Sequence, residues 1–222
     1  MNRRALSRTQ GLILIAIGIV AIGLGGVTLR NALRQPPPDI EERKWVEVER
    51  VRRGDKLIVK PEDEVLYAGI RAPFSDEPLF EESKQRNEAL VGGQRIRLRF
   101  DELERDKKGR LLTYAFADGR FVNEILVAEG LAYVRLTPGT RRFADRLLAA
   151  QKQAQQRRLG LWQNIDLDAA GPFVGDPKYG NFHRPDCAEL KKIPAERQQP
   201  LAILREAFEK GFAPCHKCRP AG

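Results

Sequence analysis

The stretch LLTYAFADGRFVNEILVAEGLAYV, residues 111–134, carries the clearest structural pattern of the chain. Residues 111–117 and 120–122 are apolar-rich runs on either side of Asp118-Gly119, a dipeptide that favours a tight hairpin between two strands. Residues 123–129 fit a short helix, and the Gly130 that follows is the residue type most favoured just beyond a helix end. A further strand is expected at residues 131–136. This stretch therefore predicts a unit in which strands and short helices alternate.

Upstream of this stretch, the sequence predicts the other strands of one sheet. Residues 45–52 alternate apolar and polar side chains, and residues 56–60 follow them after Gly54-Asp55, which together indicate a hairpin. Residues 64–70 form a third apolar run. Residues 94–100 alternate strictly, which is typical of a strand with one buried face.

Helical patterns lie on either side of these strands. Residues 79–91 look helical as far as Gly92-Gly93, and residues 141–159 carry an apolar stripe of Phe143, Leu147, Ala150 and Ala154. We therefore predict a β+α fold at residues 44–162, an OB-fold-like five-stranded barrel with packed helices. Residues 163–172 are expected to be a linker, and residues 173–222 a separate small module.

The same region resembles the thermonuclease (staphylococcal-nuclease-like) family, whose fold is an OB-fold barrel with packed helices. The resemblance covers residues 45–162 and rests on short segments that occur in the family's order and spacing: DKKGR (106–110), LTYAF (112–116), DGRFVNE (118–124), EGLAYV (129–134) and LGLW (159–162). It implies an enzyme that cleaves nucleic-acid phosphodiesters with a carboxylate-bound calcium ion, two phosphate-binding arginines and a glutamate general base.

Several positions that the resemblance assigns to this chemistry carry other residue types. The pattern retains one metal carboxylate, Asp55, and one phosphate arginine, Arg110, and both also fit a plain role in turns. The first arginine falls on Leu66, the second metal aspartate on Arg71, and the general-base glutamate on Phe74. Each lost transition-state contact commonly costs about 10²–10³ in rate. We therefore expect a barrel that does not hold calcium well and has lost catalysis, and the alternative is a nuclease with a remodelled site.

Four acidic residues follow the altered motif and bear on that alternative: Asp76, Glu77, Glu81 and Glu82. They can swing into a remodelled metal site. They can also begin and solvate the helix near residue 79, where acids complement the helix dipole.

Charge alone does not decide whether nucleic acid is the partner. The net charge is +9, but residues 1–34 contribute five arginines and no acid. Candidate nucleic-acid contacts are the loop residues Lys107 and Arg110 and three arginines on one strand face: Arg95, Arg97 and Arg99. The alternative for the three strand arginines is the solvated side of a half-buried strand. A protein partner is equally compatible with the sequence, which does not identify one.

The N-terminal segment has the length and composition of a membrane anchor. Residues 11–29 contain no charged side chain and are close to the roughly 20 residues that cross a bilayer as a helix. Arginines flank this segment on both sides, and no convincing cleavage site follows it. We expect an uncleaved anchor at residues 11–29 and a linker at residues 30–43, with a cleaved signal or a buried helix as alternatives. The basic tail favours an extracytoplasmic location for the soluble part.

The last 50 residues contain four side chains that commonly bind zinc. His183 and Cys187 form one close pair, and Cys215 and Cys218 form a second, as a closed tetrahedral zinc site requires. All three cysteines of the chain take part, and an odd number argues against a disulfide framework. His216 is the alternative imidazole. Unrelated reduced thiols or a redox Cys-x-x-Cys would leave the pattern without a metal.

The surrounding pattern is similar to Ada-type metal-binding modules, which use four cysteines and are linked with DNA repair. With histidine at the first position, we expect a structural role for the zinc. A helix carrying Leu201, Leu204 and Phe208 and ending at Gly211 is expected between the two pairs.

Overall fold

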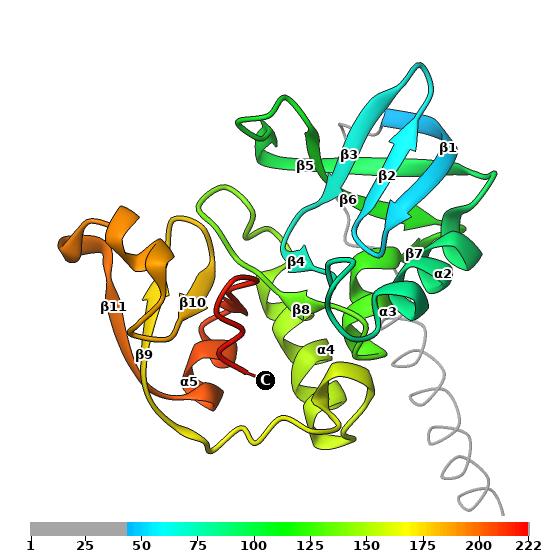
Figure 1. The fold of residues 1–222 in the computed structure, drawn as a ribbon. Coiled ribbons are helices and arrows are strands. Elements are labelled where there is room, and N and C mark those ends of the chain that lie inside the picture. The colour runs from blue at the N-terminus through cyan, green and yellow to red at the C-terminus, as the bar shows by residue number, and fades with distance from the viewer. Residues whose placement is uncertain (1–43, 222) are drawn as a thin grey trace, which may run out of the picture. The chain divides into compact units, whose positions relative to one another are not determined.

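Five strands close a small barrel, as the sequence predicts (Figure 1). The computed structural model describes residues 44–221. The barrel strands run in the order β3-β2-β1-β5-β6, and a parallel pairing of β3 with β6 closes the ring. A short strand, β7, pairs antiparallel with β6 across the predicted Asp118-Gly119 turn, where both residues have positive φ. These strands are β1 (Lys44–Arg53), β2 (Lys56–Val59), β3 (Asp63–Tyr67), β5 (Arg95–Arg105), β6 (Leu111–Ala117) and β7 (Arg120–Phe121).

The predicted anchor at residues 11–29 and the linker at residues 30–43 lie outside the described residues. Within residues 44–221, no helix is both long and apolar enough to cross a membrane.

Three helices pack against the barrel: α2 (Phe80–Val91), α3 (Val122–Ala128) and α4 (Ala144–Gln156). Gly130 has a φ of 71° directly after α3, which confirms the expected helix end. The side chain of Asn123 in α3 accepts from the N–H of Ala115 at 3.0 Å and donates to the carbonyl of Ala68 at 2.9 Å. Because Asn123 is fully buried, these bonds satisfy backbone groups that water cannot reach.

The predicted strand at residues 131–136 is much shorter than expected. Only β8 (Tyr133–Val134) is a strand, and it pairs with β4 (Ile70–Arg71) outside the barrel. The N–H of Arg135 still donates to its register partner Gly69, but that of Leu136 donates to Gly211 of the C-terminal part, both at 2.8 Å. The apolar residues therefore predicted too long a strand, because the backbone of Leu136 forms its hydrogen bond with a distant segment instead of a neighbouring strand.

The C-terminal residues build a second, four-stranded sheet in the order β11-β9-β10-β12. The prediction that Leu201 lies on a helix is wrong: Leu201 belongs to a strand, and the helix starts at Leu204. Gly211, with a φ of 77°, follows the end of that helix as predicted. These elements are β9 (Ala170–Asp176), β10 (Asn181–His183), β11 (Gln199–Ile203), α5 (Leu204–Glu209), β12 (Ala213–Pro214) and the 3-10 helices η1 (Gly160–Trp162), η2 (Ala188–Lys192) and η3 (Ala195–Arg197).

This C-terminal module, residues 170–221, shares a core with the barrel domain. Trp162 contacts Phe208 of α5 with ring centroids 4.7 Å apart, and Tyr133 stacks on the same ring at 5.8 Å. The buried side chain of Gln151 in α4 accepts from the N–H of Val134 at 2.8 Å and donates to the carbonyl of Phe208 at 3.1 Å. The module is therefore attached to the barrel by ring packing and by a buried amide.

Candidate functional site

The β1–β2 hairpin buries Asp55, the retained metal carboxylate of the resemblance. Asp55 is 1% exposed, and both of its oxygens are engaged within the protein. Its Oδ1 accepts from Nε of Arg53 at 2.5 Å, and its Oδ2 accepts from the N–H of Ala72 at 3.0 Å. The preceding Gly54 is required for this packing, because a Cβ there would lie 1.8 Å from Oγ of Ser83. Asp55 thus connects the β1–β2 hairpin to the loop that contains Ala72.

Arg71 occupies the second metal-carboxylate position and is 3% exposed. Its Nη1 donates to Oε2 of Glu77 at 2.5 Å, and the same oxygen accepts from the N–H of Phe74 at 2.8 Å. The Arg71 guanidinium also lies 5.1 Å from the centroid of the Tyr133 ring. A fixed positive charge therefore stands where the resemblance places a calcium ligand, and electrostatic repulsion opposes a cation there.

Phe74, at the general-base position, is covered by the C-terminal module. The His216 ring lies 4.4 Å from the Phe74 ring, centroid to centroid, and the Arg53 guanidinium lies 4.4 Å from the same centroid. Leu66, at the first arginine position, is 4% exposed and packs in the barrel core. These residues supply no proton acceptor and no phosphate ligand, so the residues present do not fit the calcium site that the family implies.

Arg110 is bound to its neighbour Asp106 by two hydrogen bonds, from Nε at 2.7 Å and from Nη2 at 2.5 Å. Burial raises the pKa of Asp106. The hydrogen bonds from the Arg110 side chain and from the N–H groups of Lys108 and Arg110 outweigh burial and hold that pKa below its usual value. The retained arginine thus has a carboxylate partner of its own.

The four acids near residue 79 divide between the two roles left open by the sequence. Glu81 and Glu82 lie in the first turn of α2. Glu77 instead turns back to Arg71, and Asp76 accepts from Nη2 of Arg219 at 2.5 Å. Glu77 and Asp76 are therefore each paired with an arginine of this chain, and the two do not form a free carboxylate pair for a metal.

The three strand arginines do not share one environment. Arg99 is 6% exposed, with its guanidinium 5.4 Å from the Phe143 ring centroid, so it does not lie on a solvated face. Arg95 and Arg97 lie 5.8 and 5.2 Å from the ring centroid of Trp45, which is 53% exposed. Arg95 and Arg97 remain candidate contacts for nucleic acid.

The structure brings all four predicted zinc ligands into one cluster. The parallel register of β10 and β12 pairs Phe182 with Pro214, so the next residues, His183 and Cys215, lie side by side. The cluster is completed by Cys187, which follows the turn after β10, and by Cys218, whose sulfur accepts from the N–H of Arg184 at 3.4 Å. One ligand atom from each residue lies within 4.8 Å of all the others.

This arrangement fits a tetrahedral ion. Zinc–sulfur bonds of about 2.3 Å place ligand atoms about 3.8 Å apart, close to the separations in the cluster. Nδ1 of His183 already lies 3.4 Å from the sulfur of Cys187. Burial, together with the neighbouring thiols of Cys187 and Cys215, raises the pKa of Cys218 to about 12. Negative charge on one thiolate makes ionisation of the neighbouring thiols less favourable, and a bound cation would compensate this repulsion.

The alternative imidazole, His216, lies in the turn between Cys215 and Cys218, which we call the knuckle, and faces the barrel domain. Its Nδ1 is 3.7 Å from an oxygen of Asp76 and 3.8 Å from one of Glu77. Among the described residues, only His183 joins the three thiols in a metal-binding group.

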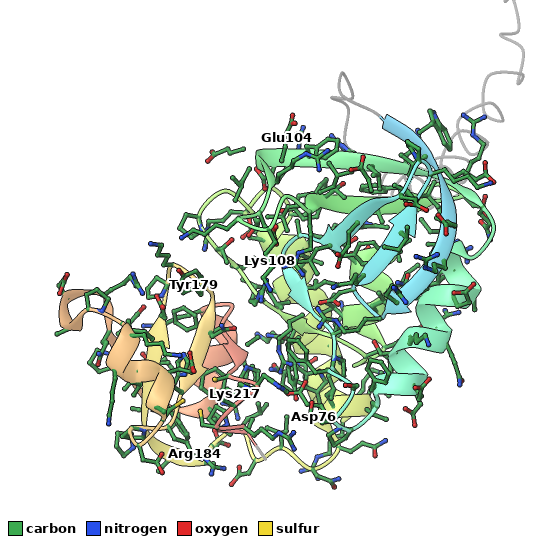
Figure 2. The ribbon with its side chains drawn as sticks, turned by 45° about the horizontal axis from the view of Figure 1, so that its top comes forward. Asp76, Glu104, Lys108, Tyr179, Arg184 and Lys217 are labelled. Carbon is green, nitrogen blue, oxygen red and sulfur yellow. The ribbon has the colours of Figure 1, made fainter. Side chains whose placement is uncertain are left out.

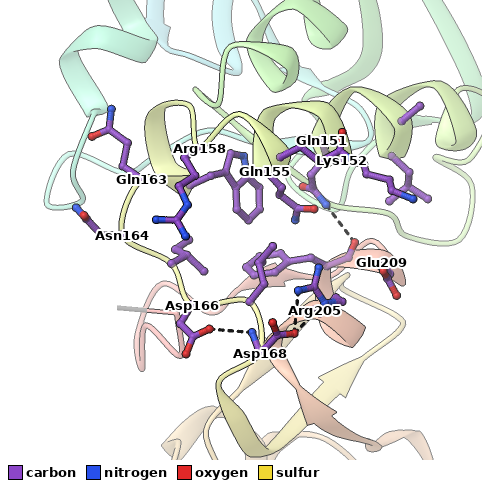
Figure 3. Close-up of a pocket in the computed structure, with 17 residues that line it drawn as sticks. Gln151, Lys152, Gln155, Arg158, Gln163, Asn164, Asp166, Asp168, Arg205 and Glu209 are labelled. Carbon is purple, nitrogen blue, oxygen red and sulfur yellow. Dashed lines mark hydrogen bonds and ion pairs between the residues drawn. The ribbon is translucent and has the colours of Figure 1, made fainter.

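A separate groove of about 790 Å³ lies between α4, residues 163–168 and α5 (Figure 3). Its charged side chains are of both signs, and Arg205 already donates to Asp168 at 2.8 Å from Nη2. The balanced charge of this groove does not indicate a ligand of either sign.

The closed barrel and its three packed helices agree with the fold that the thermonuclease resemblance implies. The family model described as "Staphylococcal nuclease homologue" matches residues 64–164. The thermonuclease of Staphylococcus hyicus is 26% identical over 165 residues, which cover 70% of this chain and 98% of that protein. Endonuclease YncB of Bacillus subtilis is 32% identical over 140 residues, covering 57% of this chain and 66% of the relative. Residues 64–164 are therefore similar to the staphylococcal nuclease homologue family, and the C-terminal module lies beyond this match.

Three residues at the junction of barrel and module were not singled out from the sequence. Arg135 carries a charge inside the apolar run at residues 131–136, which is an available signal for a special position. Tyr179 lies in an exposed turn, and Lys217 lies inside the Cys-x-x-Cys knuckle. Only the packing of the module against the barrel brings these residues to one place.

Proposed function

We propose that this protein is a thermonuclease-like module that binds nucleic acid without hydrolysing it. The observation that carries this proposal is the buried ion pair of Arg71 with Glu77 at the family's metal position. The fully engaged Asp55 and the phenyl ring at position 74 support it, because calcium-assisted hydrolysis needs carboxylate ligands and a base. Nucleic acid remains the partner class that the family relationship favours.

Digestion assays test the loss of catalysis. With single-stranded DNA or RNA and millimolar calcium, we expect the wild type to cleave no faster than Arg110→Ala. Calcium should also leave the melting temperature unchanged, since a ligand that binds the folded state would raise it. An authentic thermonuclease run in parallel controls for the assay. Calcium-dependent cleavage that Arg110→Ala abolishes would contradict the proposal.

The second candidate function, a working nuclease with a remodelled site, rests on Asp55 and Arg110 and on the relatives' names as thermonuclease and endonucleases. The same assay decides between the two.

We further propose that zinc occupies the His183 cluster as a structural ion. Three sulfur ligands and one imidazole suit zinc better than calcium or magnesium, which prefer oxygen. A set of four protein ligands leaves no open position, as is typical of structural rather than catalytic zinc.

A membrane anchor at residues 11–29, with the remainder extracytoplasmic, completes the proposal. It is supported by the uncharged length of that segment and its flanking arginines. We expect the full chain to sediment with membranes and a chain without residues 11–29 to remain in the supernatant. A reporter fused after residue 222 should be active only outside the cytoplasm, and cytoplasmic activity would reverse the orientation.

A further inference from the structure

A pocket of about 610 Å³ lies where the C-terminal module meets the barrel, and its lining is strongly cationic. The barrel contributes Arg71 and Arg135, next to Phe74 at the altered catalytic motif. The module contributes the remaining charged side chains: Lys178, Lys192, Arg197, Lys217, Asp176 and Glu189. We call this the seam pocket. Six lysine and arginine side chains against two acids make it attractive to an anion.

Internal partners neutralise only part of this charge. Arg71 pairs with Glu77, Arg197 with Asp176, and Lys192 with Glu189. Within residues 44–221, Arg135, Lys178 and Lys217 have no carboxylate in ion-pair contact, and these three are the cations open to a ligand.

Arg135 is the most informative of these cations. Burial lowers its pKa, and the nearby guanidinium groups of Arg71, Arg53 and Arg110 lower it further, against the attraction of Asp55. Because an arginine side chain stays protonated in proteins, the result is a half-buried positive charge surrounded by like charges. An anion in the seam pocket would stabilise that charge.

An aromatic ring borders the same pocket. Tyr179 is 46% exposed, and the cationic groups of Lys107, Lys178 and Arg197 lie 5.5 to 5.9 Å from its ring centroid. Lys107 belongs to the barrel loop at residues 106–110, so the ring is flanked by cations of both parts. Figure 2 shows Tyr179 and Lys217 on the module, with Lys108 of that barrel loop nearby. Single-stranded nucleic acids bind to surfaces of this kind, because their bases stack on an exposed ring and their phosphates contact the neighbouring cations.

We propose that the seam pocket binds a phosphate group of single-stranded nucleic acid through Arg135, Lys178 and Lys217, while a neighbouring unpaired base stacks on Tyr179. This inference rests on the proposed nucleic-acid function and assigns it a location outside the barrel's own catalytic positions. A single strand is favoured over a duplex because stacking on a side chain requires an unpaired base. Free nucleotides and inorganic phosphate share part of this chemistry and are separated by competition.

Fluorescence anisotropy of a short labelled DNA strand on the full zinc-loaded chain in detergent tests the inference. Tyr179→Ala should weaken binding about 5- to 150-fold through lost stacking. Lys178→Ala with Lys217→Ala should weaken it about 10-fold or more and lower the salt slope by about 1.4. The matched control, Lys84→Ala with Lys152→Ala, removes two lysines outside the seam pocket and should bind like the wild type. A mononucleotide should displace the strand at lower concentration than inorganic phosphate.

Each contrary result has its own meaning. Unchanged binding by the seam variants, with binding lost in Arg95→Ala/Arg97→Ala, would overturn the seam pocket and leave the nucleic-acid function standing. Displacement by inorganic phosphate as readily as by the mononucleotide would overturn the stacking role of Tyr179. A wild type that binds no strand at physiological salt would overturn both this inference and the proposed function.

Discussion

Cys215→Ser is expected to release the metal ion and unfold the C-terminal module. Structural zinc contributes apparent binding energies of about 10–16 kcal/mol in small zinc-dependent folds, so the part of the module around the cluster is expected to depend on it. The cluster residues Cys187 and Cys215 form a small core with Leu190 and Ile193, which is too small to hold this part of the module together alone. Elemental analysis should find one zinc per chain in the wild type and almost none in the variant. Proteolysis should cut the variant within residues 170–221.

The two histidines provide a matched pair for this experiment. His183→Ala should lose zinc like Cys215→Ser, because Nδ1 of His183 lies against the thiols. His216→Ala should retain one zinc per chain, since that ring packs on Phe74. Zinc retained by His183→Ala, or lost from His216→Ala, would show that the fourth ligand is wrongly assigned.

Arg71→Met is expected to destabilise the barrel by about 3–5 kcal/mol, because it leaves Glu77 buried without its cation. The two side chains are 3% and 10% exposed, so water replaces little of the lost interaction. For a folded unit of this size the loss corresponds to about 6–20 °C in melting temperature. Urea denaturation at neutral pH measures it directly.

A double-variant cycle separates a buried ion pair from general damage to the loop. Arg71→Met combined with Glu77→Leu should recover most of the stability, since removing both charges together is often neutral. The exposed pair of Arg120 with Asp118, 3.6 Å apart, is the matched control and should contribute less than about 1 kcal/mol. If the double variant is no more stable than Arg71→Met alone, the pair is not what holds this loop.

The altered catalytic motif has become part of the contact between barrel and module. His216 packs on Phe74, and Arg219 donates to Asp76, which lies two residues further along the same loop. Phe74, at the position where the resemblance places a general base, therefore has a structural role in this chain, because its ring contacts His216 between Cys215 and Cys218. The proposed loss of catalysis at this position and the contact with the module therefore involve the same side chain.

Sequence patterns alone were sufficient to predict the five barrel strands, the three packed helices and the four side chains that the structure brings into one potential metal-binding cluster. Strand alternation, the Asp118-Gly119 turn and the spacing of the two ligand pairs are local properties, so they can be recognised without knowing what packs nearby. The assignment of Leu66, Arg71 and Phe74 to the family's phosphate-binding, metal-binding and general-base positions rests instead on the resemblance and stays a prediction.

Only the tertiary structure decided which partners these residues meet. The shortening of the strand at residues 131–136, the strand conformation of Leu201 and the burial of Arg99 all depend on groups distant in the sequence. The same holds for the return of Glu77 to Arg71 and for the cationic pocket around Arg135 and Tyr179. Burial and charge pairing are set by how separate elements pack, and a one-dimensional pattern does not contain those distances.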